Sequence, residues 1–167
     1  KSVVGEPHLE KRIDAYVEQI PTFIDFLHRN THLRLAPLPQ FPDMYPDNPD
    51  AKMHRCHEAV PFHARALPDE EVLNLRPQHP QTALFGLIGW TPSESLILQA
   101  RGEGWLKVAI SMVARYLLDI PWRFRSLRDR RLVLGGALVG ALRHSMLDRG
   151  IPLWLNSPFE DFIEDDG

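Results

Sequence analysis

The chain has 167 residues, of which 44% are hydrophobic, so it can bury one sizeable core and is not expected to be disordered. A net charge of -3 argues against a nucleic-acid-binding protein, which would carry a basic excess. The single cysteine, Cys56, excludes an internal disulfide and fits a reducing compartment, so we expect a cytoplasmic protein.

The amino-terminal part predicts two helices. Apolar residues recur at helical spacing from Leu9 to Ile20 and again from Phe23 to Leu27, where the pattern runs on to Asn30. Pro21 stands between the two stretches and favours a corner there. A short strand is predicted at His32–Leu35.

The stretch from Pro37 to Pro92 holds ten of the fifteen prolines, which forbids continuous helix and predicts a long structured loop region. Its aromatic residues indicate a functional loop rather than a disordered one. Within it, Thr82–Ile88 has the composition of a strand, with Gly86 at a point of close approach.

Two helices are predicted next. Thr91–Glu94 is a capping box with proline at the first helical position, which indicates a helix that runs to about Ala100. Gly102 and Gly104 end it, and Arg101–Gly104 is interpreted as a link that breaks the helix. An apolar stripe from Trp105 to Ile120 then predicts a helix that Pro121 stops.

The last stretch reads as a helix followed by a strand. Helical spacing predicts one buried face that is formed by Leu138, Val139, Leu142 and Met146. Gly150 is expected to end the helix in the left-handed conformation, and the alternation over Ile151–Asn156 predicts a strand.

This segment, Gly-x-x-Leu-Val followed by Asp-Arg-Gly and Ile-Pro-Leu-Trp-Leu-Asn-Ser-Pro, resembles the end of the cap domain in FAD-dependent 3-ketosteroid dehydrogenases, relatives of fumarate reductase flavoproteins. Glu6–Arg34 resembles the opening of the same domain. The resemblance implies an α+β fold, with a small mixed or antiparallel sheet and several surrounding helices. It implies one cap or substrate domain over residues 1–167, with 132–167 returning to an FAD-binding domain. Lys1 and the Glu164–Gly167 turn suggest an excised domain.

Phe41–Asp47 resembles the Asp-Tyr-Tyr-Pro-Glu segment of that family, whose second tyrosine points from the cap at the substrate pocket. Tyr45 is the matching residue, although Met44 replaces the first tyrosine. The resemblance implies that Tyr45 is catalytic and that Phe41, Met44 and Phe85 contact substrate. Without the resemblance, Tyr45 reads as a loop aromatic packed over the core.

In that family a base removes a proton from the carbon next to a ring ketone while hydride leaves the neighbouring carbon for the flavin. The reference pKa of tyrosine is about 10, so a tyrosine base needs a hydrogen-bond donor or positive charge that stabilises phenolate. The resemblance thus implies an FAD-dependent oxidoreductase that desaturates a carbon–carbon bond, as in 3-ketosteroid Δ1-dehydrogenation. Its partners would be a steroid-like hydrophobic substrate and the FAD-binding domain of the same parent chain.

The sequence contains no Gly-x-Gly-x-x-Gly, so FAD would be bound mainly outside this chain, and the fragment alone is expected to be inactive. Two alternatives stay open. One is a fumarate reductase or succinate dehydrogenase-like flavoprotein acting on a small dicarboxylate, against which the aromatic loop argues. The other is a binding module without catalysis.

Two further clusters contain charged or potentially metal-binding side chains. The histidines, cysteine and glutamate of residues 54–63 lack metal-site spacing, so no metal site is predicted there. Five arginines form a basic cluster at Arg123, Arg125, Arg128, Arg130 and Arg131. They are interpreted as a solvated turn paired with Asp119 and Asp129, the alternatives being contact with the FAD domain or with an anionic membrane surface.

Overall fold

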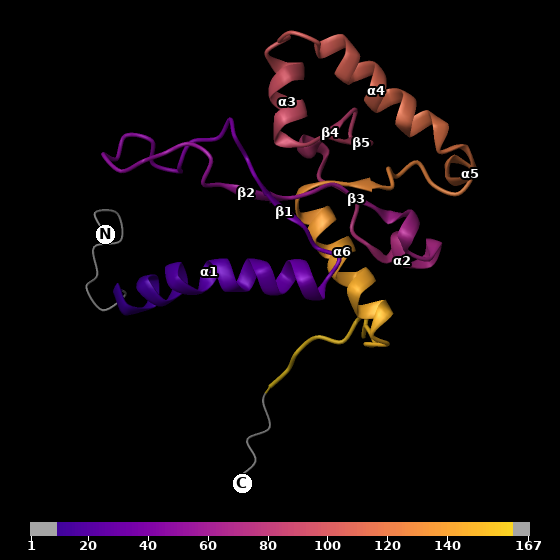
Figure 1. Ribbon diagram of the computed structural model, residues 1–167. Coiled ribbons are helices and arrows are strands. Elements are labelled where there is room, and N and C mark those ends of the chain that lie inside the picture. The colour runs from indigo at the N-terminus through magenta and orange to yellow at the C-terminus, as the bar shows by residue number, and fades with distance from the viewer. Residues whose placement is uncertain (1–9, 162–167) are drawn as a thin grey trace.

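The computed structural model describes residues 10–161 (Figure 1); Lys1, Leu9 and the Glu164–Gly167 turn lie outside the described residues. The helices are α1 Glu10–Asn30, α2 Asp69–Asn74, α3 Pro92–Gln99, α4 Trp105–Leu118, α5 Ile120–Arg123 and α6 Leu134–Asp148. The strands are β1 Leu35–Pro37, β2 His57–Ala59, β3 Phe62–His63, β4 Ala83–Leu84, β5 Ile88–Gly89 and β6 Arg131–Leu132. Single 3-10 turns lie at η2 Ala64–Ala66 and η3 Pro80–Thr82. No helix within residues 10–161 is long and apolar enough to cross a membrane.

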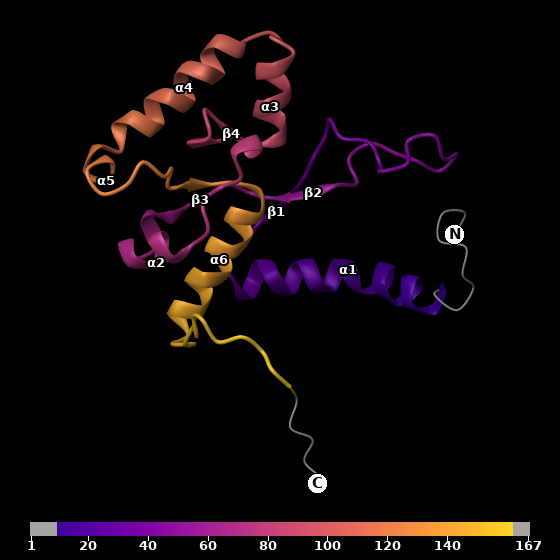
Figure 2. The same cartoon turned by 180° about the vertical axis from the view of Figure 1, so that it is seen from behind.

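The strands form three separate antiparallel pairs, β1–β2, β3–β6 and β4–β5. The α+β class predicted from the sequence is confirmed, but the small sheet is divided into these two-stranded pieces. The pair β3–β6 joins residues far apart in the chain, with Phe62 opposite Leu132. Figures 1 and 2 show β3 near the middle of the molecule, between α6 and the part that carries α3 and α4.

Helix α6 packs across β2, β3 and β6 through its small residues. Ala137 and Ala141 are buried, and a Cβ on Gly140 would lie 2.6 Å from Cδ1 of Leu132. The strands can therefore approach the helix axis closely. Around this contact lies the main core, formed by Leu33, Ala59, Ala64, Leu67, Val72, Trp122, Leu132, Ala137 and Ala141.

The predicted buried face of α6 is wrong at Leu138 and Val139, whereas Leu142 packs against the main core. Leu138 and Val139 are exposed, and Leu142 and Met146 are half-buried. Helical spacing fits the small-residue face as well as the large-residue face, so periodicity could not tell them apart. The close approach of the strands selects the small face, which leaves large apolar side chains on the surface.

Helix α1 corrects a second prediction, because Glu10–Asn30 is one continuous helix with Pro21 inside it. Proline removes one hydrogen bond to the carbonyl four residues earlier, that of Val17. Val17 is itself exposed, so solvent can hydrogen bond to this carbonyl. Only the carboxyl end of α1 reaches the main core, through Leu27, and the rest of the helix projects from the body (Figure 1).

The carboxyl end of α6 confirms the predicted role of Gly150, which has φ +63°. The N–H of Ile151 donates to the carbonyl of Met146 at 2.9 Å, and that of Gly150 to Leu147 at 3.0 Å, which together close the helix. The predicted strand over Ile151–Asn156 is wrong. A strand needs a neighbour to pair with, and Figures 1 and 2 show this segment leading away from the body.

The predicted strand over Thr82–Ile88 is a hairpin instead. Phe85 and Gly86 both have positive φ, at 55° and 68°, and the N–H of Leu87 donates to the carbonyl of Leu84 at 3.1 Å. These are the conformations of a tight hairpin turn that matches the twist of its strands. The hairpin packs on α4 around Ile88, Met112 and Tyr116, which form a second, smaller core.

The helices after the hairpin are close to prediction. Thr91 and Glu94 make both hydrogen bonds of the capping box, at 3.2 and 2.9 Å, and α3 runs to Gln99. Gly104 has φ +77° before α4, which ends at Leu118, and Pro121 lies in the first turn of α5. The sequence did not predict α2, and the first strand lies at Leu35–Pro37 rather than at His32–Leu35.

Ion pairs tie the helices of the body together. Arg143 of α6 is 8% exposed and donates two hydrogen bonds to the Glu71 carboxylate of α2, at 2.6 and 2.8 Å. Hydrogen bonding from Arg143 lowers the pKa of Glu71. Arg130 holds Asp119 in the same way, at 2.5 and 2.8 Å, and this hydrogen bonding lowers the pKa of Asp119.

Candidate active-site arm

Residues 38–56, here called the arm, connect β1 to β2 and carry the predicted catalytic tyrosine. β1 and β2 pair with Leu35 opposite Ala59. Pairing continues beyond them: the N–H of Leu38 donates to the carbonyl of Cys56 at 2.8 Å, and Pro42 forms a bridge with Met53. The arm is thus an irregular antiparallel ribbon, and it reaches out from the body in Figures 1 and 2.

The tip of the arm is shaped by hydrogen bonds around Asp43. Its carboxylate accepts from the N–H of Lys52 at 2.9 Å and from Arg55 at 3.2 Å. Within the tip, the N–H of Asn48 donates to the carbonyl of Tyr45 at 3.2 Å. Many short-range hydrogen bonds in a proline-rich segment define the backbone without a core beneath it, so the tip can present side chains outward.

Tyr45 and Met44 are such side chains, with exposed fractions of 58% and 85%. Phe41 lies nearer the root of the arm and is half-buried. The structure therefore gathers three of the four predicted site residues on one arm. Tyr45 does not pack over the core, so its interpretation as a loop aromatic that covers the core is wrong.

Phe85, the fourth predicted residue, lies apart from the arm. It occupies the turn between β4 and β5, is 80% exposed and lines an apolar groove of about 660 Å³ together with Trp105 and Ile110 of α4. In both ribbon views the arm extends to the side away from this hairpin. A side-chain hydrogen bond of 3.2 Å between Ser93 and Gln40 links α3 to the arm.

A charged group lies at the base of the arm. Glu58 of β2 has a raised pKa, mainly because burial disfavours its charge and also because Glu94 repels it, while Arg131 attracts it. Burial also opposes ionisation of Glu94, but hydrogen bonds from the N–H of Thr91 and from Arg131 lower its pKa overall. Arg131 meets Glu94 with two hydrogen bonds of 3.0 Å.

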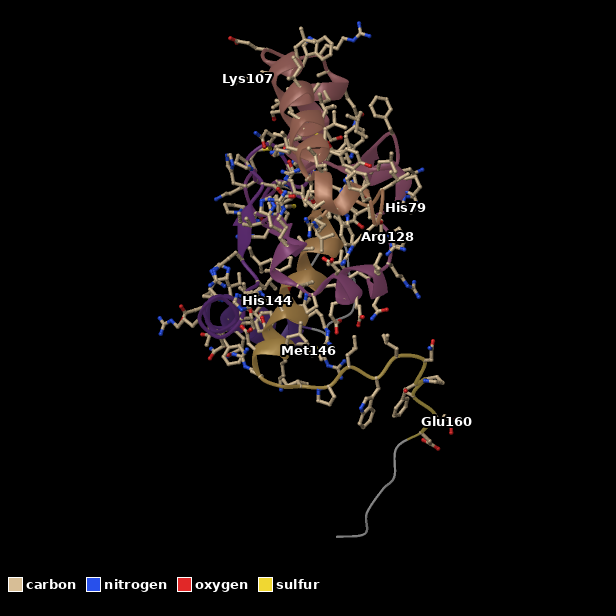
Figure 3. All side chains as sticks on the ribbon, turned by 90° about the vertical axis from the view of Figure 1, so that its right-hand side faces the viewer. His79, Lys107, Arg128, His144, Met146 and Glu160 are labelled. Carbon is tan, nitrogen blue, oxygen red and sulfur yellow. The ribbon has the colours of Figure 1, made fainter. Side chains whose placement is uncertain are left out.

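The five arginines of the basic cluster are all engaged within the protein. The predicted pairing with Asp119 is confirmed, but the turn is not solvated throughout, because the side chains of Arg123, Arg130 and Arg131 are largely buried. Arg130 pairs with Asp119, Arg131 with Glu94 and Arg125 with Asp69. Arg123 and Arg128 donate to backbone carbonyls of Leu127, Arg128, Leu73 and Leu75. Asp129 accepts from the N–H of Arg131, and burial raises its pKa. Figure 3 labels Arg128 beside the segment that carries His79.

His57 and Cys56, at the root of the arm, make separate local contacts. Nδ1 of His57 lies 3.0 Å from the carbonyl oxygen of Arg55, and Sγ of Cys56 lies 3.6 Å from that of Pro42. Within residues 10–161, the three potential metal ligands that converge are His32, His144 and Asp148. Sequence reasoning missed them, because His32 follows α1 and the other two lie on α6.

A cavity of about 530 Å³ lies beside the start of α6 and was also missed. Its walls come from three distant segments, represented by Gln78, Val133, Gly136 and Leu153. No local pattern links these positions, since the packing of the chain creates the cavity. Val139 lines this cavity and is exposed, although the sequence analysis placed it in the core.

Comparison with known proteins gives a consistent result. The chain is 27% identical over 157 residues to a 3-oxosteroid 1-dehydrogenase of Comamonas testosteroni, a match that covers 93% of this chain and 27% of that protein. It is 28% identical over 167 residues to the 3-oxosteroid 1-dehydrogenase of Mycobacterium tuberculosis, covering 99% and 28%. No protein-family model matches.

Among solved structures, the chain is similar to the 3-ketosteroid Δ1-dehydrogenase of Sterolibacterium denitrificans in complex with 1,4-androstadiene-3,17-dione. The TM-score is 0.85 and the identity 38%, over 93% of this chain and 28% of that one. The fold of this chain is thus similar to that of one segment of that dehydrogenase. The relatives are 3-ketosteroid Δ1-dehydrogenases, which confirms the resemblance found in the sequence, and this chain spans about 28% of their length.

Proposed function

We propose that this chain is the segment of an FAD-dependent 3-ketosteroid Δ1-dehydrogenase that covers the steroid over the flavin. The observation that carries the proposal is the structural similarity over 93% of the chain to a 3-ketosteroid Δ1-dehydrogenase solved with a steroid dione. The exposed apolar residues of the arm support it, since a ring-ketone steroid offers mainly apolar surface.

Tyr45 is the residue of this segment proposed to handle the proton. The reaction removes a proton from the carbon next to the ketone, so a base must reach that carbon. Tyr45 stands at the tip of the arm with most of its side chain free, and the fixed backbone of the tip defines where the phenol lies. The group that stabilises its phenolate would come from the rest of the enzyme.

The residues of this chain do not fit an FAD site. No Gly-x-Gly-x-x-Gly is present to hold the pyrophosphate. FAD, held by the remainder of such an enzyme, would supply the hydride acceptor. The role left to this chain is to enclose the substrate, exclude water and position Tyr45.

A small dicarboxylate is a poorer fit as substrate. Binding a dianion calls for arginines free to form bidentate pairs with it. The five arginines of the basic cluster already pair with carboxylates or carbonyls of this chain, and the arm presents apolar side chains at its tip. The same engagement of the arginines argues against their binding a membrane surface.

The test is anaerobic reduction of the flavin in the intact parent protein, once by a 3-ketosteroid and once by succinate, in the wild type and in Tyr45→Phe. We expect fast bleaching by steroid, none by succinate, and a rate in the variant lower by about 10²- to 10⁴-fold, which is the usual contribution of a general base. The matched control is Tyr16→Phe, which removes the hydroxyl of another exposed tyrosine, on α1, and should leave the rate unchanged.

Each outcome decides a different part of the proposal. Steroid bleaching that Tyr45→Phe does not slow would keep the reaction and remove Tyr45 from the proton transfer. Bleaching by succinate alone would replace the steroid with a dicarboxylate. If the parent protein contained no flavin, the proposal would be rejected in favour of a binding module without catalysis.

A further inference from the structure

Two histidines and an aspartate meet where α1 joins α6. Nε2 of His32 lies 2.5 Å from Oδ2 of Asp148, and Nε2 of His144 lies 3.8 Å from Oδ1 of the same carboxylate. All three potential ligand atoms lie within 4.8 Å of one another. Figure 3 shows the labelled His144 beside the coil of α1, seen end-on.

The backbone that carries these side chains is fixed on both sides. The N–H of His32 donates to Oγ of Ser145 at 2.8 Å, and Ser145 in turn donates to the carbonyl of Ala141 at 2.8 Å. Thr31 adds a hydrogen bond of 2.6 Å to the carbonyl of Leu27. His144 and Asp148 are four residues apart on α6, so they share one helical face. The three ligands are therefore held together before any ion arrives.

In both rings Nε2 is the nitrogen that faces Asp148. Nδ1 of His144 is buried and has no hydrogen-bond partner. Nε2 of the same ring is turned toward Asp148. The ring of His32 stacks on the ring of His144, with ring centres 3.9 Å apart and planes at 17°.

We propose that His32, His144 and Asp148 bind a divalent transition-metal ion, with Zn²⁺ as the best fit, and that the ion fastens the end of α1 to the last turns of α6. Two imidazoles and one carboxylate are ligands that Zn²⁺ takes, with water completing a tetrahedron. Nothing in the proposal depends on the steroid reaction, since these residues lie on the body rather than on the arm.

Forming the site takes local side-chain movements. Zn–N and Zn–O bonds of about 2.0–2.2 Å put tetrahedral ligand atoms roughly 3.3–3.5 Å apart. His32 must therefore move about 1 Å away from Oδ2 of Asp148. Because His144 faces the other oxygen, Oδ1, at 3.8 Å, the carboxylate must also turn to offer one oxygen to both rings. The stacked rings direct their nitrogens nearly parallel, so the His32 ring, the more exposed of the two, must turn.

The positive charge next to the site is that of Arg149, which already makes hydrogen bonds within the protein. Arg149 donates to the carbonyls of Ser145 and Asn30, which turns its guanidinium toward the backbone. An ion at the site would join residues 116 positions apart in the sequence. By mass action it would stabilise the folded chain and fix the direction in which α1 projects.

The test is titration of the tag-free, chelator-stripped chain with Zn²⁺ by calorimetry and with Co²⁺ by visible absorption. We expect one equivalent to bind, a tetrahedral Co²⁺ spectrum, a higher Tm with Zn²⁺ and weaker binding as pH falls, because imidazole ligands must lose their protons. His32→Gln and Asp148→Asn should each weaken binding by at least about tenfold, the lower range seen even for groups that only support metal ligands.

His57→Gln is the matched control, since His57 is a histidine at the root of the arm, and it should bind Zn²⁺ as the wild type does. Circular dichroism shows that each variant is folded before titration. The proposal is overturned if the folded wild type binds no stoichiometric metal, in which case the cluster is an ion pair only. It is equally overturned if His32→Gln and Asp148→Asn bind as tightly as the wild type, or if His57→Gln abolishes uptake.

Discussion

Glu58 carries a partly buried charge that its neighbours stabilise only in part. One of its carboxylate oxygens, Oε2, is buried without a hydrogen-bond partner, and burial together with repulsion from Glu94 raises its pKa above 4.5. Arg131 attracts Glu58 but donates two hydrogen bonds to the carboxylate of Glu94 instead. Glu58 is thus the weaker partner of a shared arginine at the base of the arm.

The pH dependence of stability follows from this shift. Because the folded-state pKa is raised, the folded protein binds more protons than the unfolded chain between the two pKa values, so the free energy of unfolding falls as pH rises from about 4.5 through the folded pKa. Glu58→Gln should remove this loss and stabilise the protein at neutral pH, because it removes the charge that burial and Glu94 disfavour.

Urea unfolding of Glu58→Gln at several pH values measures the effect. Glu103→Gln serves as the control, since it removes the same charge from an exposed link between α3 and α4. A Glu58→Gln curve that stays parallel to the wild-type curve at every pH would show that Glu58 does not carry the dependence.

Helix α6 is built so that its small face meets the strands. A Cβ on Gly140 would lie 2.6 Å from Cδ1 of Leu132 and 3.0 Å from Cδ1 of Phe62, whereas Gly135 of the same helix has no neighbour within 4 Å. Gly140→Ala gains up to about 1 kcal/mol of helix propensity but overpacks the core at about 1–3 kcal/mol. We therefore expect a net destabilisation of roughly 1 kcal/mol.

The comparison with Gly135→Ala isolates the contact from the propensity. That variant should be neutral or slightly stabilising, because the new methyl group meets open space. Chemical denaturation of the two variants gives the difference. If Gly140→Ala is as stable as Gly135→Ala, the strands do not press on α6 as closely as described.

Helix α3 depends on its cap. Thr91 accepts a hydrogen bond from the N–H of Glu94, whose side chain accepts from the N–H of Thr91, and Thr91 is buried. Thr91→Ala should lower the free energy of unfolding by about 1 kcal/mol, whereas Thr91→Ser keeps the oxygen and should cost much less. Equal stabilities of the two variants in thermal unfolding would argue that the cap contributes little.

The chain leaves large apolar surfaces uncovered. The arm tip with Met44 and Tyr45, the groove lined by Phe85 and Trp105, and the outer face of α6 at Val139 are all open. Exposed patches of this kind mark contacts with other surfaces. The chain spans about 28% of the length of its relatives, and under the proposed function we expect the rest of the parent enzyme to cover these surfaces.

It follows that the separate chain should fold without holding flavin. The chain has a core and internal ion pairs of its own, but no dinucleotide-binding glycine motif. We expect a cooperative unfolding transition, no stoichiometric flavin absorbance after purification and no steroid turnover. The parent protein purified in parallel supplies the positive control, and a yellow chain with one flavin per molecule would contradict the expectation.

The sequence by itself determined those features that local interactions decide. The capping box at Thr91, the stripe of α4 and the positive φ of Gly150 all depend on residues within a few positions, so they could be predicted. Short sequence motifs near both ends of the chain also pointed to the 3-ketosteroid dehydrogenases, which the comparisons then found as relatives. Whether Tyr45 is catalytic stays a prediction, although its exposed position on the arm is consistent with it.

Tertiary structure decided everything that depends on which segments meet. It chose the small face of α6 over the large one, because the β3–β6 pair leaves no room for larger side chains at Gly140. It kept α1 continuous through Pro21 and left Ile151–Asn156 without a strand partner. It also brought His32 to Asp148 across 116 positions, with His144 beside them, and no sequence period carries information over such a separation.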